Sequence, residues 1–143
     1  MSDLGTHLRT MAAYNRWANR RLYAEAGTLP DVLYRQGAGA FFGSLHGTLN
    51  HLLVTDRIWM TRLDGQGEAP TRLDAILFED LEPLRVAREA EDARIIGFVA
   101  GLSDRALAEN FEYATTRGAP QRQPRWEALA HLFNHQTHHR GQA

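Results

Sequence analysis

The sequence contains no cysteine and no lysine, so all sixteen basic side chains among its 143 residues are arginine. Without cysteine the chain has no disulfides, no thiolate ligands and no cysteine nucleophile. Without lysine it has neither a Schiff-base amine nor a lysine general base. Any metal must therefore be held by histidine, aspartate, glutamate or neutral oxygen donors.

Excess charge of one sign and long apolar runs are also missing. The formal net charge is -1 at pH 7 with histidine counted as neutral, which predicts neither a nucleic-acid partner nor attraction to an anionic membrane. No apolar run approaches the roughly 20 residues of a membrane span, and the chain does not open with a basic and then apolar leader. We therefore expect a cytoplasmic protein without a membrane partner.

The balance of residue types is that of a globular protein, with 43% hydrophobic and 23% charged residues. The length fits one domain, and no internal repeat or linker divides residues 1–143. Apolar residues at helical spacing predict four helices, at about residues 6–26, 44–63, 80–102 and 126–143.

The connections between the predicted helices are long. Residues 111–115 are suited to a short strand, and Arg117-Gly118-Ala119-Pro120 is suited to turn the chain back before the last helix. The sequence therefore predicts an all-α fold, a four-helix bundle with long connections and room for a short β-hairpin before the last helix.

Four of the seven histidines lie within nine residues near the end of the chain. Side chains four residues apart on a helix point the same way, so His131 with His135 and His135 with His139 are both candidate ligand pairs. On a helical wheel His135 and His139 lie near Leu132 on the inward stripe, whereas His131 and His138 lie toward the edge. The wheel favours His135 with His139.

Two histidines do not make a metal site. A histidine-rich helix end is also favourable when it is only solvated, because cationic imidazoles interact well with the helix dipole. Catalytic zinc usually has three protein ligands, and cysteine is unavailable here. Candidates for the third ligand are His46, His51, Asp56 and the acidic residues of the third predicted helix.

Three segments resemble the DinB/YfiT-like family of four-helix metal-binding proteins: YNRWAN at 14–19, LNHLLVTDRIW at 49–59 and NHQTHHRGQ at 134–142. The resemblance covers essentially the whole chain. In that family a histidine of the second helix and the spaced pair of the last helix bind the metal. The resemblance thus implies the ligands His51, His135 and His139, whereas the residues alone leave His46 as a rival to His51.

Three neutral imidazoles leave the charge of a divalent metal uncompensated, which makes it a strong Lewis acid with open positions and suits zinc or nickel. In a cysteine-free chain any thiolate must come from a cosubstrate. The family resemblance implies thiol S-transferases that use low-molecular-weight thiols, and it implies a homodimer. We therefore predict a divalent-metal-binding protein, with metal-dependent thiol S-transfer on a small-molecule substrate as the favoured activity.

Two alternatives stay open. One is a metal-dependent hydrolase, although no HExxH pattern supplies a general base, since Asn134 precedes His135 and Gln136 follows it. The other is a non-enzymatic metal-binding module of a stress response. Two further charged residues have open roles: Asp56 either orients an imidazole or bonds to Trp17 or an arginine, and Arg140 either receives an anionic substrate group or lies on the surface.

Overall fold

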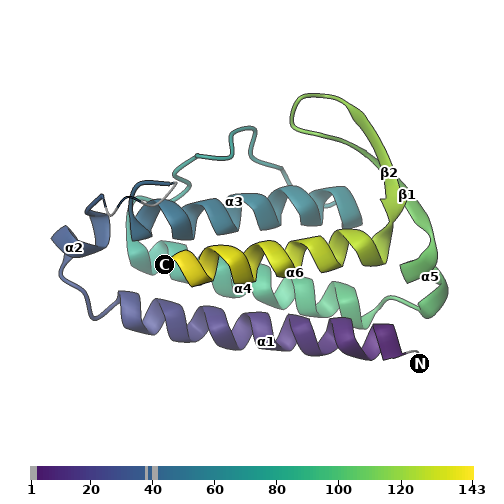
Figure 1. Cartoon of the computed structure of the whole chain (residues 1–143), viewed down its shortest axis with the longest axis horizontal. Helices are drawn as coiled ribbons and strands as arrows, with labels where there is room; N and C mark the ends of the chain where they lie inside the picture. Colours follow the sequence, from purple (N-terminus) through teal and green to yellow (C-terminus); the bar gives the residue numbers. More distant parts are fainter. Residues whose placement is uncertain (1–2, 38, 40–41) are drawn as a thin grey trace.

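The structure is a computed structural model, and it describes residues 3–37, 39 and 42–143. Figure 1 shows four long helices lying side by side: α1 (Asp3–Ala26), α3 (Leu45–Asp64), α4 (Leu81–Ala100) and α6 (Arg125–Gln142). The connections hold two short helices and two strands: α2 (Asp31–Arg35), α5 (Asp104–Ala108), β1 (Asn110–Ala114) and β2 (Pro120–Pro124). The predicted four-helix bundle is confirmed.

The short elements agree only in part with the prediction from sequence. Strands β1 and β2 pair in an antiparallel hairpin, with Asn110 opposite Pro124, directly before α6 as predicted. Neither α2 nor α5 is predicted from the sequence. Each of these helices has five residues, a single turn, which is too short to show helical periodicity in the sequence.

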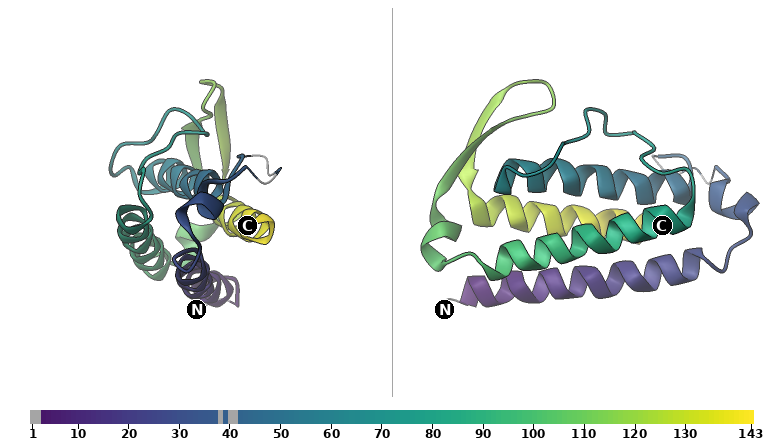
Figure 2. Two further views of the ribbon diagram at one scale, coloured as in Figure 1. Left: turned by 90° about the vertical axis from the view of Figure 1, so that its left-hand side faces the viewer. Right: turned by 180° about the vertical axis from the view of Figure 1, so that it is seen from behind.

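The four long helices surround one axis, with α1 opposite α3 (Figure 2, left). Helices α1 and α3 each pack against both α4 and α6. The loop between α3 and α4 and the β-hairpin both lie on the α3 side of the bundle (Figure 1). None of the helices in the described ranges combines the length and apolar character that crossing a bilayer requires.

The ends of α3 are set by local chemistry. The Ser44 hydroxyl accepts a hydrogen bond of 3.0 Å from the Gly47 main-chain N–H, as expected of a helix N-cap. Gly65 ends the helix with a φ of 71°, a left-handed conformation that favours glycine. A Cβ atom at Gly47 would lie 2.2 Å from the Phe42 carbonyl oxygen, so only glycine lets the preceding loop pack this closely on α3.

Two apolar clusters form the core, one toward each end of the bundle. The cluster near the hairpin contains Leu8, Met60, Ile95 and Leu129, with other residues of α1, α3, α4 and α6. The cluster near α2 contains Tyr23, Tyr34, Leu49, Leu53 and Leu84. Burying each large apolar side chain contributes about 1.5–3 kcal/mol, so these clusters supply much of the stability of the bundle.

A buried polar layer separates the two apolar clusters along the helices. Arg88 of α4 donates to Asp56 of α3 at 2.5 Å and to Asp92 at 3.0 Å. Gln136 of α6 donates to Asp56 at 2.6 Å, and Asn19 of α1 donates to Asp92 at 3.1 Å. All four long helices therefore meet in one hydrogen-bonded network, which offsets part of the cost of burying its charges.

The structure resolves the alternatives for Asp56 and Arg140. Asp56 bonds to Arg88 and Gln136, so the expected arginine partner is confirmed. The alternative prediction, a hydrogen bond between Asp56 and Trp17, is wrong, because Trp17 is 55% exposed on α1 and Asp56 is buried in the polar layer. Arg140 donates to Gln136 and to the side-chain oxygens of two asparagines of α1, so it extends this layer rather than pointing freely into solvent.

Candidate metal centre

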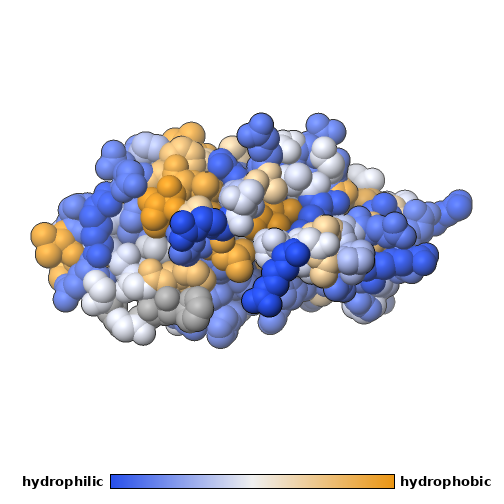
Figure 3. Space-filling model, turned by 90° about the horizontal axis from the view of Figure 1, so that it is seen from above, coloured by the Kyte–Doolittle hydropathy of each residue, from blue (hydrophilic) through white to orange (hydrophobic). Residues whose placement is uncertain are grey.

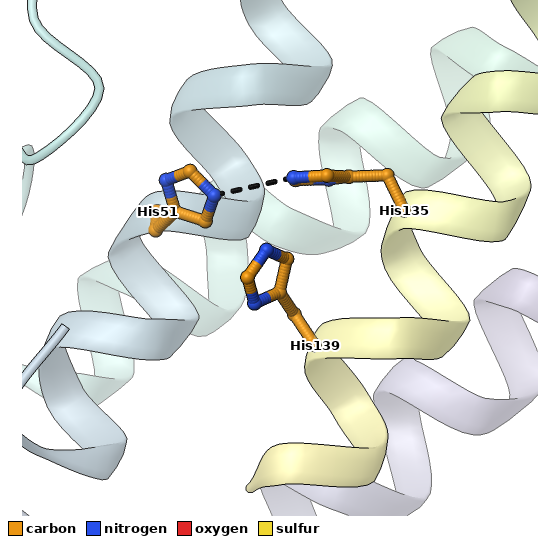
Figure 4. A group of neighbouring side chains, drawn as sticks. All are labelled: His51, His135 and His139. Carbon is orange, nitrogen blue, oxygen red and sulfur yellow. Dashed lines mark hydrogen bonds between the residues drawn. The ribbon is translucent and has the colours of Figure 1, made fainter. Parts of the chain in front are cut away.

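Three histidines from two helices point toward one another. His135 and His139 project from successive turns of α6, and His51 faces them from α3 (Figure 4). The Nε2 atoms of His51 and His135 are 3.3 Å apart. One ring nitrogen from each of the three residues lies within 4.8 Å of the others. The structure thus gathers the three histidines that the family resemblance implies.

The packing of α3 on α6 sets the register of this cluster. Gln136, which follows His135, is fully buried and donates a hydrogen bond of 3.3 Å to the carbonyl oxygen of Leu52, which follows His51. The same amide bonds to Asp56 one turn further along α3. Two hydrogen bonds from one side chain therefore hold the two histidine-bearing turns against each other.

Each imidazole has an oxygen beside its Nδ1 atom. The Nδ1 atom of His51 lies 2.8 Å from the Leu73 carbonyl oxygen, and that of His139 lies 2.8 Å from the Gln142 amide oxygen. The Nδ1 atom of His135 lies 3.5 Å from the Thr55 hydroxyl. A neutral imidazole carries its proton on one nitrogen only, so an Nδ1–H that donates to these oxygens leaves the lone pair on Nε2.

The nitrogen positions fit a small divalent cation. Two imidazole nitrogens bound to one tetrahedral zinc at about 2.0–2.1 Å lie about 3.3–3.4 Å apart. The separation of His51 Nε2 and His135 Nε2 is 3.3 Å. Histidine ligands of metals commonly donate their second N–H to a carbonyl, carboxylate or similar acceptor, as these rings do. With a His139 nitrogen within 4.8 Å of the other two, the donor set is compatible with a metal ion.

The three imidazoles are neutral near pH 7. Burial lowers the pKa of His135 to about 3, and the nearby imidazole of His139 acts in the same direction. Burial also lowers the pKa of His51 and the pKa of His139. Because metal ligation needs the unprotonated ring, a cation does not have to displace protons from this site at neutral pH.

Phe42 covers one side of the cluster. Its ring stacks on the His51 imidazole with centroids 3.7 Å apart and an angle of 18° between the planes. It meets His139 edge-on with centroids 5.6 Å apart. The close contact of the Phe42 main chain with Gly47 holds this loop against α3. The aromatic ring thus shields two of the imidazoles from water.

The other histidines of the sequence analysis lie outside the cluster. His46 is buried elsewhere, with Nδ1 2.7 Å from the Tyr34 hydroxyl, so it does not join His135 and His139. His131 and His138 are exposed on α6, as the helical wheel predicts. The predicted inward orientation of His135 and His139 is therefore confirmed. That this pair binds a metal stays a prediction.

The three oxygens that lie beside the Nδ1 atoms are not among the residues predicted from the sequence. Thr55 lies four residues after His51, and Gln142 lies three residues after His139, so helical spacing brings each close to the cluster and could have identified it. Leu73 contributes through its main-chain carbonyl from the loop after α3. No residue pattern could have pointed to that contact, because any residue type offers the same carbonyl group.

Comparison with known proteins agrees with this architecture. The sequence model of the DinB family matches residues 1–143 of this chain. Protein DinB of Bacillus subtilis (strain 168) is 28% identical over 138 residues, an alignment that spans 90% of this chain and 77% of the Bacillus subtilis protein. Because the match to the family extends over the full sequence, the chain belongs to the DinB family.

Proposed function

We propose that this chain binds one divalent metal ion through His51, His135 and His139. The observation that carries the proposal is the convergence of these rings, with two Nε2 atoms 3.3 Å apart and an oxygen beside each Nδ1 atom. Three imidazoles with an open position suit zinc or nickel, and the Irving–Williams order makes occupancy depend on which metal is available.

Calorimetric titration of metal-free protein with zinc and with nickel tests the site. We expect one equivalent to bind, and alanine at His51, His135 or His139 to weaken binding at least about 100-fold, because two imidazoles remain where catalytic sites use three. His131→Ala and His138→Ala are matched controls, since both residues lie exposed on the same helix. Wild-type affinity in all three cluster variants would overturn the proposal.

A His46→Ala variant separates the proposed site from its rival. His46 is buried and bonds to Tyr34, so its loss is expected to lower stability while leaving metal stoichiometry and affinity unchanged. If this variant lost the metal and His51→Ala kept it, the third ligand would be His46.

We further propose that the chain catalyses metal-dependent thiol S-transfer. When bound, a divalent metal supplies a Lewis acid that lowers the pKa of a thiol toward neutrality. The thiol must come from a low-molecular-weight cosubstrate, since the chain has no cysteine. The thiol sulfur forms a bond to an electrophilic carbon, the leaving group departs with its bonding electron pair, and the thiol proton passes to solvent.

The arrangement of charged groups supports transfer over hydrolysis. A metal-dependent hydrolase needs a general base near the metal, and the carboxylate of Asp56 is fully buried and bonded to Arg88 and Gln136. Within the described part of the chain, the candidate metal cluster contains histidines alone. The neutral rings can bind a cation, and Phe42 shields one side of them from water.

The activity is tested with metal-loaded protein, 1-chloro-2,4-dinitrobenzene as electrophile and a panel of small thiols. We expect conjugation that is lost on chelation and in His135→Ala, and retained in His138→Ala. Turnover of ester or amide panels without a thiol would favour the hydrolase. Metal binding without turnover in either assay would favour a non-enzymatic metal-binding module. A homodimer and a cytoplasmic location stay predictions.

A further inference from the structure

A groove lies beside the histidine cluster, on the side of the bundle that carries the loop and the hairpin. A pocket of about 220 Å³ is lined by residues that include Thr55, Trp59, Arg62, Leu73 and Tyr113. Thr55 and Leu73 are the residues whose oxygens lie beside His135 and His51. The pocket therefore ends against the cluster.

A second pocket continues the first one away from the histidines. It has a volume of about 280 Å³ and shares Ile58, Arg62, Thr115 and Thr116 with the first. Because Arg62 lines both, its side chain lies where the two pockets join. Figure 3 shows this face of the molecule, where apolar side chains gather next to strongly hydrophilic ones. The combined space approaches the size of a small-molecule site.

Among the residues that the structure describes, no carboxylate balances the positive charge of Arg62. Its guanidinium carbon lies 4.7 Å from the centroid of the Trp59 ring and 4.9 Å from that of Tyr113. Within residues 3–37, 39 and 42–143, the guanidinium forms neither a hydrogen bond nor an ion pair with the protein. Burial lowers the pKa of Arg62, which reflects the cost of holding this charge partly out of water.

Two arginines of the polar layer differ in this respect. Arg88 is paired with Asp56 and Asp92, and Arg140 donates to Asn15, Asn19 and Gln136. Both guanidinium groups thus donate hydrogen bonds to other side chains of the protein, although one nitrogen of Arg88 is buried without a partner. Arg62 instead keeps its planar set of N–H donors available in a groove with aromatic walls, the arrangement that recognises a carboxylate through paired hydrogen bonds.

We infer that this groove binds the carboxylate of a small ligand on Arg62, with the apolar part of the ligand against Trp59 and Tyr113. The inference deepens the proposed function and rests on it, because the groove is lined by Thr55 and Leu73, whose oxygens lie beside the Nδ1 atoms of His135 and His51. The carboxylate can belong to the electrophile or to the thiol cosubstrate. Either source presents the same planar anion, and the threonines of the groove offer further hydrogen bonds.

Equilibrium binding tests the inference without turnover. The probes are 3-phenylpropanoate and its uncharged amide, titrated calorimetrically into metal-free wild-type protein in the presence of a chelator. We expect the carboxylate to bind at least about tenfold more tightly than the amide, as one charge-assisted contact would give. Equal binding of the two probes, or no binding of either, would overturn the inference, and this comparison requires no variant.

Substitutions of Arg62 test whether this residue causes the tighter binding of the carboxylate. Arg62→Gln and Arg62→Met are expected to abolish the preference for the carboxylate, with Met retaining apolar contact with the rings. Arg57→Gln is the matched control, because Arg57 is on the same helix, also packs over an aromatic ring, that of Phe78 at 5.7 Å, and lies outside both pockets. Preserved preference in both Arg62 variants, or its loss in Arg57→Gln alone, would sink the assignment.

A His135→Ala variant keeps the two proposals apart. It is expected to lose the metal and keep the carboxylate preference, so failure of either proposal is seen separately. The source of the carboxylate follows from steady-state kinetics with charged and neutral pairs: 3-mercaptopropanoate with 2-mercaptoethanol, and 4-(bromomethyl)benzoate with its methyl ester. We expect Arg62→Gln to raise the KM of the charged member of one pair at least about tenfold and to leave the neutral members unchanged.

Discussion

The Nδ1 atom of His51 lies 2.8 Å from the main-chain carbonyl oxygen of Leu73, which belongs to the loop between α3 and α4. This contact places the ring proton on Nδ1 and directs the Nε2 lone pair of His51 toward His135. The candidate ligand from α3 is therefore oriented by a segment outside the four long helices. The same loop residue lines the groove that contains Arg62, so the orientation of the cluster and the shape of the adjoining pocket depend on one loop.

The amide of Gln142 is expected to matter for metal affinity although it does not contact the metal. Its oxygen lies 2.8 Å from His139 Nδ1, and loss of such an acceptor commonly lowers metal affinity about 10–100-fold. Gln142→Ala should therefore weaken zinc binding by that factor in a competition assay with a chromophoric chelator. Gln142→Glu keeps an acceptor oxygen at this position and should bind zinc as tightly as wild type. Asn134→Ala, on the exposed face of α6, is the control. Equal affinity of Gln142→Ala and wild type would contradict the assigned tautomer.

The metal-free protein should lose stability as the pH falls below about 6.5. His135 has a pKa of about 3 in the folded state and 6.5 as the reference value, so between these values the unfolded chain binds a proton that the folded chain does not. Stability contributed by the neutral ring is then present above pH 6.5 and lost as the pH falls toward 3, with a slope of at most about 1.4 kcal/mol per pH unit.

Urea unfolding between pH 4 and pH 7 measures this slope. His135→Ala should flatten the decline of the free energy of unfolding with falling pH, because the residue that takes up the proton is gone. His138→Ala, which removes an exposed imidazole of the same helix, should leave the slope as in wild type. Identical slopes for His135→Ala and wild type would show that His135 is not neutral in the folded state.

The buried polar layer should be sensitive to the loss of a single partner. Arg88→Met leaves Asp56 and Asp92 buried without their cation, and breaking a buried ion pair in this way costs about 3–5 kcal/mol. Arg85→Met removes an arginine of the same helix whose partners Glu82 and Glu89 are exposed, and should cost about 1 kcal/mol or less. Chemical denaturation compares the two variants. Equal costs would indicate that the layer is open to water.

Truncation of a buried leucine of α3 tests the packing of the core. Leu53 of α3 is fully buried in the cluster near α2, so Leu53→Ala should lower the free energy of unfolding by about 2–5 kcal/mol. Val86→Ala on α4 is the comparison, since Val86 is 55% exposed, and its effect should stay within about 0.5 kcal/mol. A cost for Leu53→Ala near that of Val86→Ala would place Leu53 outside the core.

Much of the helical framework was predictable from residue spacing. The periodicity of residues 44–63 predicted α3, which runs from Leu45 to Asp64. The single turns α2 and α5 were not predictable, because five residues carry too little periodicity to stand out. The sequence left open whether Asp56 orients an imidazole or bonds to Trp17 or an arginine. Its partners Arg88 and Gln136 come from other helices, and only the packing of those helices shows which groups bond to it.

The sequence by itself determined that His135 and His139 share one face of α6, because a spacing of four residues and the geometry of a helix are sufficient for that. The resemblance of its motifs to one family selected His51 over His46. Only the tertiary structure decided that His51, 84 residues from His135, approaches it within 3.3 Å, that a loop carbonyl orients its ring, and that Arg62 lines the same pocket as Thr55 and Leu73. These relationships depend on how α3, α6 and the connecting loop pack together, and periodicity within one helix carries no information about packing between elements.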